Sequence, residues 1–229
     1  MNQYRLYKGA WIFFEESKEN LLSEKESKDL LRNGGLMIRN TYDFDTKEET
    51  SFWFIIKDKL EDISELPSST RKKIRRALNT YTFRKCTIED LEKVAYGIIR
   101  SAEKSYKVRC RPTSADDFKT LINEYKIIKE KPNKIDDREY WCIENKSDGS
   151  IVGFSVNTIK IDSCEYDNAK CMAESLHNST YPYYGLFYEM NRHYLGERKF
   201  KYVSDGSRSI TEHSNIQQFL MYNFKFRKA

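Results

Sequence analysis

The chain has 229 residues, with 40 Lys and Arg against 35 Asp and Glu, which gives a net charge of +5. This length allows one large domain, or one medium domain with a smaller companion, and it suffices to bury a core. The five cysteines form no CxxC pair and the three histidines no HxxxH spacing, which argues against a disulfide framework, a zinc site and a histidine-rich metal site.

No apolar run approaches the length of a membrane-spanning helix, since the longest, FWFII at 52–56, is the size of a strand. The first residues lack the contiguous apolar core and the cleavage site of a signal peptide. Scattered cysteines of odd number are typical of reduced thiols. We therefore expect a cytoplasmic protein.

Residues 1–65 are predicted to form a strand-rich extension packed on the core of the protein. Short aromatic and β-branched runs at 11–14, 35–44 and 51–58 have the composition of strands. The charged stretch 17–33 carries four leucines and ends before two glycines, which indicates a short helix.

The second region, 66–229, begins with a basic helix that reads LPSSTRKKIRRALNTY. Ser68, Ser69 or Thr70 is expected to cap this helix after Pro67. The cations proposed as phosphate ligands for tRNA or another polyanion are Arg71, Lys72, Arg75 and Arg76. An ordinary solvated helix face is the other interpretation of the same residues.

Hydrophobic periodicity and turn residues predict the elements that follow. Strands are expected at 80–86, 140–144, 150–162, 170–176 and 199–203, and helices at 87–106, 114–128, 180–195 and 215–224. This β-α-α-β-β-β-α-β-α order favours a mixed, mostly antiparallel sheet with helices on both faces.

The long strand at 150–162 changes the parity of its apolar residues at Asn157 and Thr158. A β-bulge at this point would produce the change. A strand that is buried on both faces would produce it equally well.

The segment SDGSRSITEHSN, between the last strand and the last helix, is the first candidate site because it is long and rich in reactive side chains. Its candidate catalytic residues are Asp205 as base, Ser207 as hydrogen-bond donor and His213 as proton carrier, and its candidate substrate-binding residues are Arg208 and Glu212. A simple turn at Asp205-Gly206 followed by a helix cap is the alternative.

The loop before the helix at 180–195 supplies further candidates. His177 and Asn178 are expected to bind substrate and Tyr184 to take part in catalysis, because the start of the next helix favours an anion. Aromatic packing is the competing interpretation for the tyrosine. Glu174, near the end of a predicted strand, is expected to be an exposed residue, with a role as base as the alternative, and His193 is expected to be a surface residue of its helix.

The order of elements from residue 80, the basic helix SSTRKKIRRALNTY and the C-terminal run YPYYGLFYEMNRHYLGERKFKYVSDGSRSITEHSNIQQFLMYNFKFRK resemble the GNAT acyltransferase superfamily, and more closely its Fem-type branch of bacterial acyltransferases. The resemblance covers about two thirds of the chain, from Leu66 onward. It implies a GNAT-like domain at 66–229 that transfers an acyl or aminoacyl group to an amine or hydroxyl acceptor.

The donor stays open between acyl-CoA and aminoacyl-tRNA, and the acceptor is a small molecule, sugar or peptide. A coenzyme-A-dependent GNAT enzyme carries a glycine-rich loop whose backbone N–H groups approach the pyrophosphate closely. The corresponding stretch here, LHNSTYPYYG, has one late glycine, so this loop is not evident. Fem-type enzymes lack this loop because they use aminoacyl-tRNA. The alternative function is an inactive GNAT-like module that binds nucleic acid or a protein partner.

Overall fold

A computed structural model describes residues 4–7, 9–13, 22–40, 44–46, 53–106, 111–130, 137–208 and 215–229. The chain forms two compact units, one of residues 1–51 with Ala229 and the other of residues 52–228. Strand β4 (Phe54–Lys57), which lies inside the N-terminal extension expected from the sequence, belongs to the larger unit and pairs within its sheet.

The smaller unit contains a three-stranded sheet and one helix. Its strands are β1 (Tyr4–Tyr7), β2 (Ala10–Phe13) and β3 (Met37–Arg39), in that order, and its helix is α1 (Glu24–Arg32). Ser23 begins the helix with a capping box, because its side chain accepts from the Glu26 amide and Glu26 accepts from the Ser23 amide.

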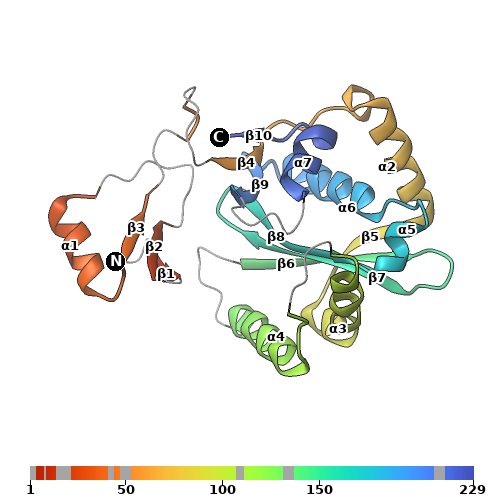
Figure 1. Cartoon of the computed structure of the whole chain (residues 1–229). Helices are drawn as coiled ribbons and strands as arrows, with labels where there is room; N and C mark the ends of the chain where they lie inside the picture. The colour runs from red at the N-terminus through yellow and green to blue at the C-terminus, as the bar shows by residue number, and fades with distance from the viewer. Residues whose placement is uncertain are drawn as a thin grey trace. The chain divides into compact units, whose positions relative to one another are not determined.

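The larger unit is built on a seven-stranded sheet in the order β10-β4-β9-β8-β7-β6-β5 (Figure 1). Its other strands are β5 (Tyr81–Cys86), β6 (Asp137–Asn145), β7 (Ile151–Ile159), β8 (Ser163–Cys171), β9 (Tyr202–Ser207) and β10 (Arg227–Lys228). Every neighbouring pair in this sheet is antiparallel except β8 and β9, which are parallel. The mixed, mostly antiparallel sheet expected from the sequence is confirmed.

Helices cover both faces of this sheet (Figure 1). They are α2 (Ser68–Thr80), α3 (Ile88–Lys104), α4 (Ala115–Glu130), α5 (Ala173–His177), α6 (Pro182–Asn191), which continues as a π-helix at Arg192–Glu197, and α7 (Ile216–Phe224). A short 3-10 helix at Ile63–Glu65 precedes α2. One core cluster joins the sheet to α2, α6 and α7, and a second joins it to α3 and α4.

The third strand of the meander is not where the sequence predicted it. Strand β8 occupies Ser163–Cys171, and residues 173–177 form helix α5 instead of continuing a strand at 170–176. The run SCEYDNAKC was missed because polar residues occupy most of its positions. Its buried Cys164 and Tyr166 nevertheless alternate with more exposed residues, as they do in any strand with one covered face.

Strand β7 is buried on both faces, which was one of the two interpretations of its parity change. Phe154 and Val156 pack in the cluster with α3 and α4, whereas Ile159 packs in the cluster with α6 and α7. The register with β8 does shift between Val156 and Asn157, but the extra residue is Asp167 on β8. The bulge predicted at Asn157 and Thr158 is therefore carried by the neighbouring strand.

Two helix starts differ from the capping that the sequence suggested. Pro67 is the residue before α2 and no side chain caps that helix, while Thr70 is fully buried and donates from Oγ1 to Asn223 Oδ1 on α7 over 2.8 Å. Tyr181, in the left-handed region at φ 57°, precedes α6, and Pro182 is its first residue. The buried hydrogen bond fixes α2 against α7.

Candidate functional site

Strands β8 and β9 pair only over their first residues and then part. The parallel pairing joins Ser163–Glu165 to Tyr202–Ser204 and extends no further along the described residues, although β8 continues to Cys171 and β9 to Ser207. The opposite edge of β9 stays paired with β4 as far as Ser207. Parallel strands that diverge leave backbone groups and side chains available to a ligand at the centre of the sheet.

Asp205 lies in β9 immediately beyond this point. Phe54 and Ile56 of β4 pair with Ser207 and Ser204, so Asp205 and Gly206 together oppose one residue, as in a β-bulge. Gly206 has φ of +74°, which a residue with a side chain adopts only with strain. The bulge rotates the backbone and sets the direction of the Asp205 carboxyl.

Burial is the main cause that raises the pKa of Asp205 to about 7; the nearby carboxylates of Glu165 and Asp167 contribute in the same direction, and a hydrogen bond with the Gln217 side chain acts against them. A carboxyl with this pKa gains and loses a proton near neutral pH, which is the property of an efficient general base or acid. Perturbed carboxyls of this kind cluster at functional sites.

Two acidic side chains of β8 lie beside Asp205, and each has a cationic partner. Lys160 Nζ donates to Glu165 Oε2 over 3.1 Å, and Arg138 NH1 donates to Asp167 Oδ2 over 3.0 Å. Burial raises the pKa of Asp167 to about 6. Because the neighbouring carboxylates are paired with these cations, Asp205 is the carboxyl best placed to exchange a proton with a substrate.

The sequence did not reveal either acidic residue of β8, because the predicted strand at 170–176 starts seven residues too late and ends five residues too late. The signal that would have found them is the alternation in CEYDN, in which acids follow each buried residue. A Cβ on Gly206 would lie 3.0 Å from Glu165 Oε1, so the glycine leaves room for that carboxylate.

Ser207 ends strand β9 and Arg208 follows it. The Ser207 carbonyl accepts from Gln217 Nε2 of α7 over 2.9 Å, and the Arg208 guanidinium stacks 4.6 Å from the centroid of the Trp53 ring. These contacts hold both residues beside Asp205. Three further positions that the sequence singled out, Ser209, Glu212 and His213, lie outside the described residues.

Tyr184 belongs to a separate aromatic cluster at the start of α6. Lys73 of α2 donates to its hydroxyl over 2.9 Å and lies 4.8 Å from its ring centroid, and Phe219 packs edge-on against it at 4.9 Å. Helix α7 thus contacts Asp205 through Gln217 and Tyr184 through Phe219.

His177 ends α5 and Asn178 follows it, and both are exposed. Among the described residues, no hydrogen bond or ion pair joins either of them to Asp205 or Tyr184. Asp205, Ser207 and Arg208 are thus neighbours along the chain at the end of β9, whereas no described contact links His177 or Asn178 to them.

The residues at the start of α6 do not fit the pyrophosphate of coenzyme A. Pro182 has no N–H to donate, Tyr181 is in the left-handed region, and the Tyr184 amide donates to the Tyr181 carbonyl. Gly185 serves packing, because a Cβ there would lie 2.1 Å from Phe83 Cζ. No glycine therefore remains for close approach to a phosphate.

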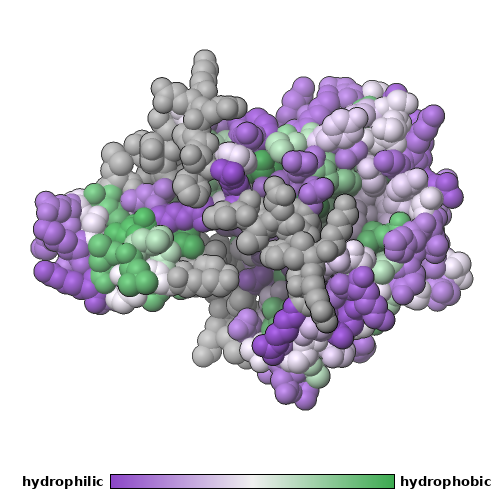
Figure 2. Space-filling model, viewed as in Figure 1, coloured by the Kyte–Doolittle hydropathy of each residue, from purple (hydrophilic) through white to green (hydrophobic). Residues whose placement is uncertain are grey.

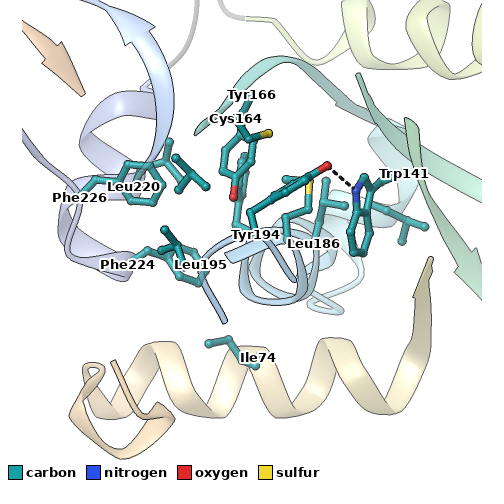
Figure 3. Packing of buried hydrophobic residues seen from close by; sticks show 14 of the residues in the cluster. Ile74, Trp141, Cys164, Tyr166, Leu186, Tyr194, Leu195, Leu220, Phe224 and Phe226 are labelled. Atoms are coloured by element: carbon teal, nitrogen blue, oxygen red, sulfur yellow. Dashed lines mark hydrogen bonds between the residues drawn. The ribbon is translucent and has the colours of Figure 1, made fainter. Parts of the chain in front are cut away.

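A buried hydrogen-bond network, which the sequence did not reveal, crosses the core near the π-helix. The Tyr194 hydroxyl accepts from Trp141 Nε1 over 3.0 Å (Figure 3). It also accepts from Asn157 Nδ2 over 3.2 Å and donates to Glu139 Oε2 over 3.0 Å. Each polar atom of this group has a partner, so the network specifies how α6 packs on β6 and β7. We assign it a structural role.

The described part of the chain contains no group of three or more His, Cys, Asp or Glu residues arranged to hold a metal ion. Its cysteines Cys86, Cys142, Cys164 and Cys171 are free. None of its helices has the length and apolar character that crossing a membrane requires.

Comparison with solved structures identifies the fold. FemX superposes with a TM-score of 0.60 at 12% identity, over 77% of this chain and 59% of FemX. The protein has the GNAT-like fold of the Fem-type transferases. L-PGS from Bacillus licheniformis superposes with a TM-score of 0.51 at 10% identity, over 96% of this chain and 72% of that one.

A third structure with this fold is the C-terminal domain of a putative lysylphosphatidylglycerol synthetase from Agrobacterium fabrum, with a TM-score of 0.50, 11% identity and coverage of 89% of this chain and 65% of that domain. The chain thus spans less than two thirds of FemX. No protein-family model and no curated protein matches the sequence.

Proposed function

We propose that the protein transfers an acyl or aminoacyl group to an amine or hydroxyl acceptor, with Asp205 as the general base. The observation that carries the proposal is the Asp205 carboxyl, with its pKa raised to about 7, at the point where β8 and β9 diverge. The Fem-type fold supports a transferase, and one of the structural neighbours is named a putative lysylphosphatidylglycerol synthetase.

In the proposed step, the acceptor nitrogen or oxygen attacks the carbonyl carbon of an ester donor and passes its proton to the Asp205 carboxylate. A new C–N or C–O bond forms, the ester C–O bond breaks, and the leaving oxygen gains one proton, so that the proton balance closes. Ser207 and Arg208 lie next to the base and are proposed to donate hydrogen bonds to the oxyanion and to the donor.

The donor that we propose is an aminoacyl ester of tRNA. The residues at the start of α6 do not fit the pyrophosphate of coenzyme A, and the resemblance of the sequence to Fem-type enzymes implies an aminoacyl-tRNA donor. The acceptor is a small molecule, a sugar or a peptide. His177, Asn178 and Tyr184 are proposed to contact the acceptor, and Glu212 and His213 to carry protons.

The thermal midpoint of the protein in the presence of each candidate donor provides the first test of the donor. A ligand at one hundred times its dissociation constant adds about 2.7 kcal/mol of stability. We expect the thermal midpoint to rise with bulk aminoacyl-tRNA and to stay unchanged with acetyl-CoA or free coenzyme A. A rise with coenzyme A alone would contradict the donor assignment.

A second candidate function is a binding module without catalysis. It is favoured by the outer face of α2, where Arg71, Lys72, Arg75 and Arg76 make no salt bridge with any described residue. This candidate predicts that binding of RNA survives while no group is transferred.

A further inference from the structure

Two cysteines that the proposed transfer reaction does not use lie on neighbouring strands. Cys86 is the last residue of β5, and Cys142 lies within β6. In the register of this antiparallel pair, Cys142 opposes Arg84 and Cys86 opposes Tyr140, so the two cysteines are diagonal neighbours. Opposed residues, and residues two apart on one strand, project from the same face of a sheet. Cys86 and Cys142, which we call the thiol pair, therefore share one face.

The face that carries the thiol pair is the one that α3 and α4 cover. Cys86 packs against the core cluster of these helices, and Cys142 opposes Phe154 of the same cluster on β7. Cys142 is fully buried, whereas Cys86 is only half-buried. The outer surface over α3 and α4 is mostly hydrophilic where it is visible (Figure 2). The pair thus has one sulfur that a small molecule in solvent can reach and one that is sealed in the core.

The two thiols are in contact. The Cys86 thiol donates a hydrogen bond to Cys142, and this bond is the main cause that lowers the pKa of Cys142; the Arg84 guanidinium acts in the same direction and burial acts against them. The same bond raises the pKa of Cys86, so the pair holds one proton between its two sulfurs. Burial raises the pKa values of the single cysteines Cys164 and Cys171. Because the thiolate is the reactive form, the pair is more reactive than these single thiols.

The spacing of the thiol pair favours a disulfide that forms and breaks readily. Diagonal neighbours have Cα atoms about 7 to 8 Å apart, whereas a disulfide usually joins Cα atoms no more than about 6.8 Å apart. Forming the bond therefore requires the two strands to approach by about 1 Å. Strand β5 is free to make this movement, because it is an edge strand that pairs only with β6 among the described strands. A strained disulfide is reduced more easily than a relaxed one, as regulatory disulfides are.

We propose that Cys86 and Cys142 form a reversible oxidation site, at which a hydroperoxide converts the two thiols into a disulfide. The proton that the pair retains moves to Cys142, and the Cys86 thiolate attacks one oxygen of the peroxide. The O–O bond breaks, hydroxide leaves, and Cys86 becomes a sulfenic acid. The Cys142 thiol then attacks this sulfur, so that an S–S bond forms and water leaves. With hydrogen peroxide, two thiols and one peroxide give one disulfide and two waters, and two electrons pass from sulfur to oxygen.

The test treats the full native chain with a slight molar excess of hydrogen peroxide, blocks the remaining thiols with iodoacetamide and maps the cross-linked peptides by mass spectrometry. We expect a disulfide between Cys86 and Cys142 and the loss of two of the five free thiols. Reduced glutathione should restore all five thiols. This map needs no variant, so its result does not depend on whether a substituted chain folds.

Variants separate the roles of the two sulfurs. In Cys142→Ser, oxidation of Cys86 should stop at the sulfenic acid, which dimedone labels, and in Cys86→Ser the thiol of Cys142 should stay reduced. Cys110→Ser is the matched control, at a cysteine outside the described residues, and should keep the disulfide.

Four results of the wild-type map would overturn the proposal. These are the absence of any thiol loss, a disulfide that involves Cys110, Cys164 or Cys171, a cross-link between two chains, and conversion of Cys86 to a sulfinic acid without a disulfide. A bond between Cys86 and Cys142 that forms only after unfolding in urea would overturn it equally, because the proposal rests on their contact in the native sheet.

Discussion

Replacement of Asp205 by Asn tests the electrostatics of the proposed site without any knowledge of the substrate. The ordinary pKa of an aspartate is 3.8, and in the native protein that of Asp205 is about 7. Between these values the native state binds more protons than the unfolded state, so this group makes stability fall as pH rises through that window.

A pKa displacement of about 3 units corresponds to about 4 kcal/mol at most, at 1.36 kcal/mol per unit. Asp205 is partly exposed, so solvent screening reduces the expected effect to about 2 kcal/mol. Asn is neutral at every pH and keeps the shape of the side chain. We therefore expect Asp205→Asn to gain about 2 kcal/mol relative to wild type between pH 5 and pH 8, or about 4 to 8 °C in thermal midpoint.

Urea unfolding at pH 5, 6, 7 and 8 measures this difference directly. Asp116→Asn is the matched control, because the Asp116 side chain is 94% exposed. Parallel pH profiles for wild type and Asp205→Asn would refute the assignment of a raised pKa to this carboxyl. If the free energy of unfolding of Asp116→Asn changed as much as that of Asp205→Asn, the effect would come from the change in net charge.

Three further predictions follow from the geometry. Gly206 and Gly149 have φ of +74° and +73°, so replacement of either by Ala should lower the free energy of unfolding in urea by about 1 kcal/mol. Only Gly206→Ala should slow transfer, because only this variant crowds the Glu165 carboxylate, and equal transfer rates for the two variants would contradict this. Gly185→Ala should destabilise the protein by about 1 to 3 kcal/mol, because the added methyl group overlaps Phe83. Gly97 has open space around it, so Gly97→Ala should be neutral or stabilising by up to about 1 kcal/mol, and similar urea midpoints for the two variants would refute the packing argument. If Asp205 is the base, kcat/KM for transfer should rise with pH through about 7, and a flat profile would assign the proton transfer elsewhere.

The order of helices and strands could be predicted from the sequence because it depends on the spacing of apolar residues along the chain. The helix at Ile88–Lys104, for example, lies within the expected range 87–106, begins with a capping box of Thr87 and Asp90, and buries apolar residues at helical spacing. Apolar spacing and turn residues are local properties, so they survive the absence of tertiary information.

The site was only partly predictable, because its pKa values and pairings depend on contacts across the sheet. Asp205 could be singled out from its neighbours in the chain, but Glu165, Asp167 and Gln217 come close to it only through folding. The same holds for Lys73 of the basic helix, whose hydrogen bond to the Tyr184 hydroxyl joins residues that are far apart in the sequence.

Transfer of a labelled aminoacyl group is the most direct test of the proposed function. Bulk tRNA charged with radioactive amino acids is mixed with the protein and an amine probe, glycinamide, and the labelled aminoacyl-glycinamide is counted over time at pH 7.5. We predict protein-dependent product with wild type and with Asp116→Asn, and loss of at least about 100-fold in rate with Asp205→Asn. A wild-type rate no higher than that of Asp205→Asn or of the protein-free reaction would contradict the account.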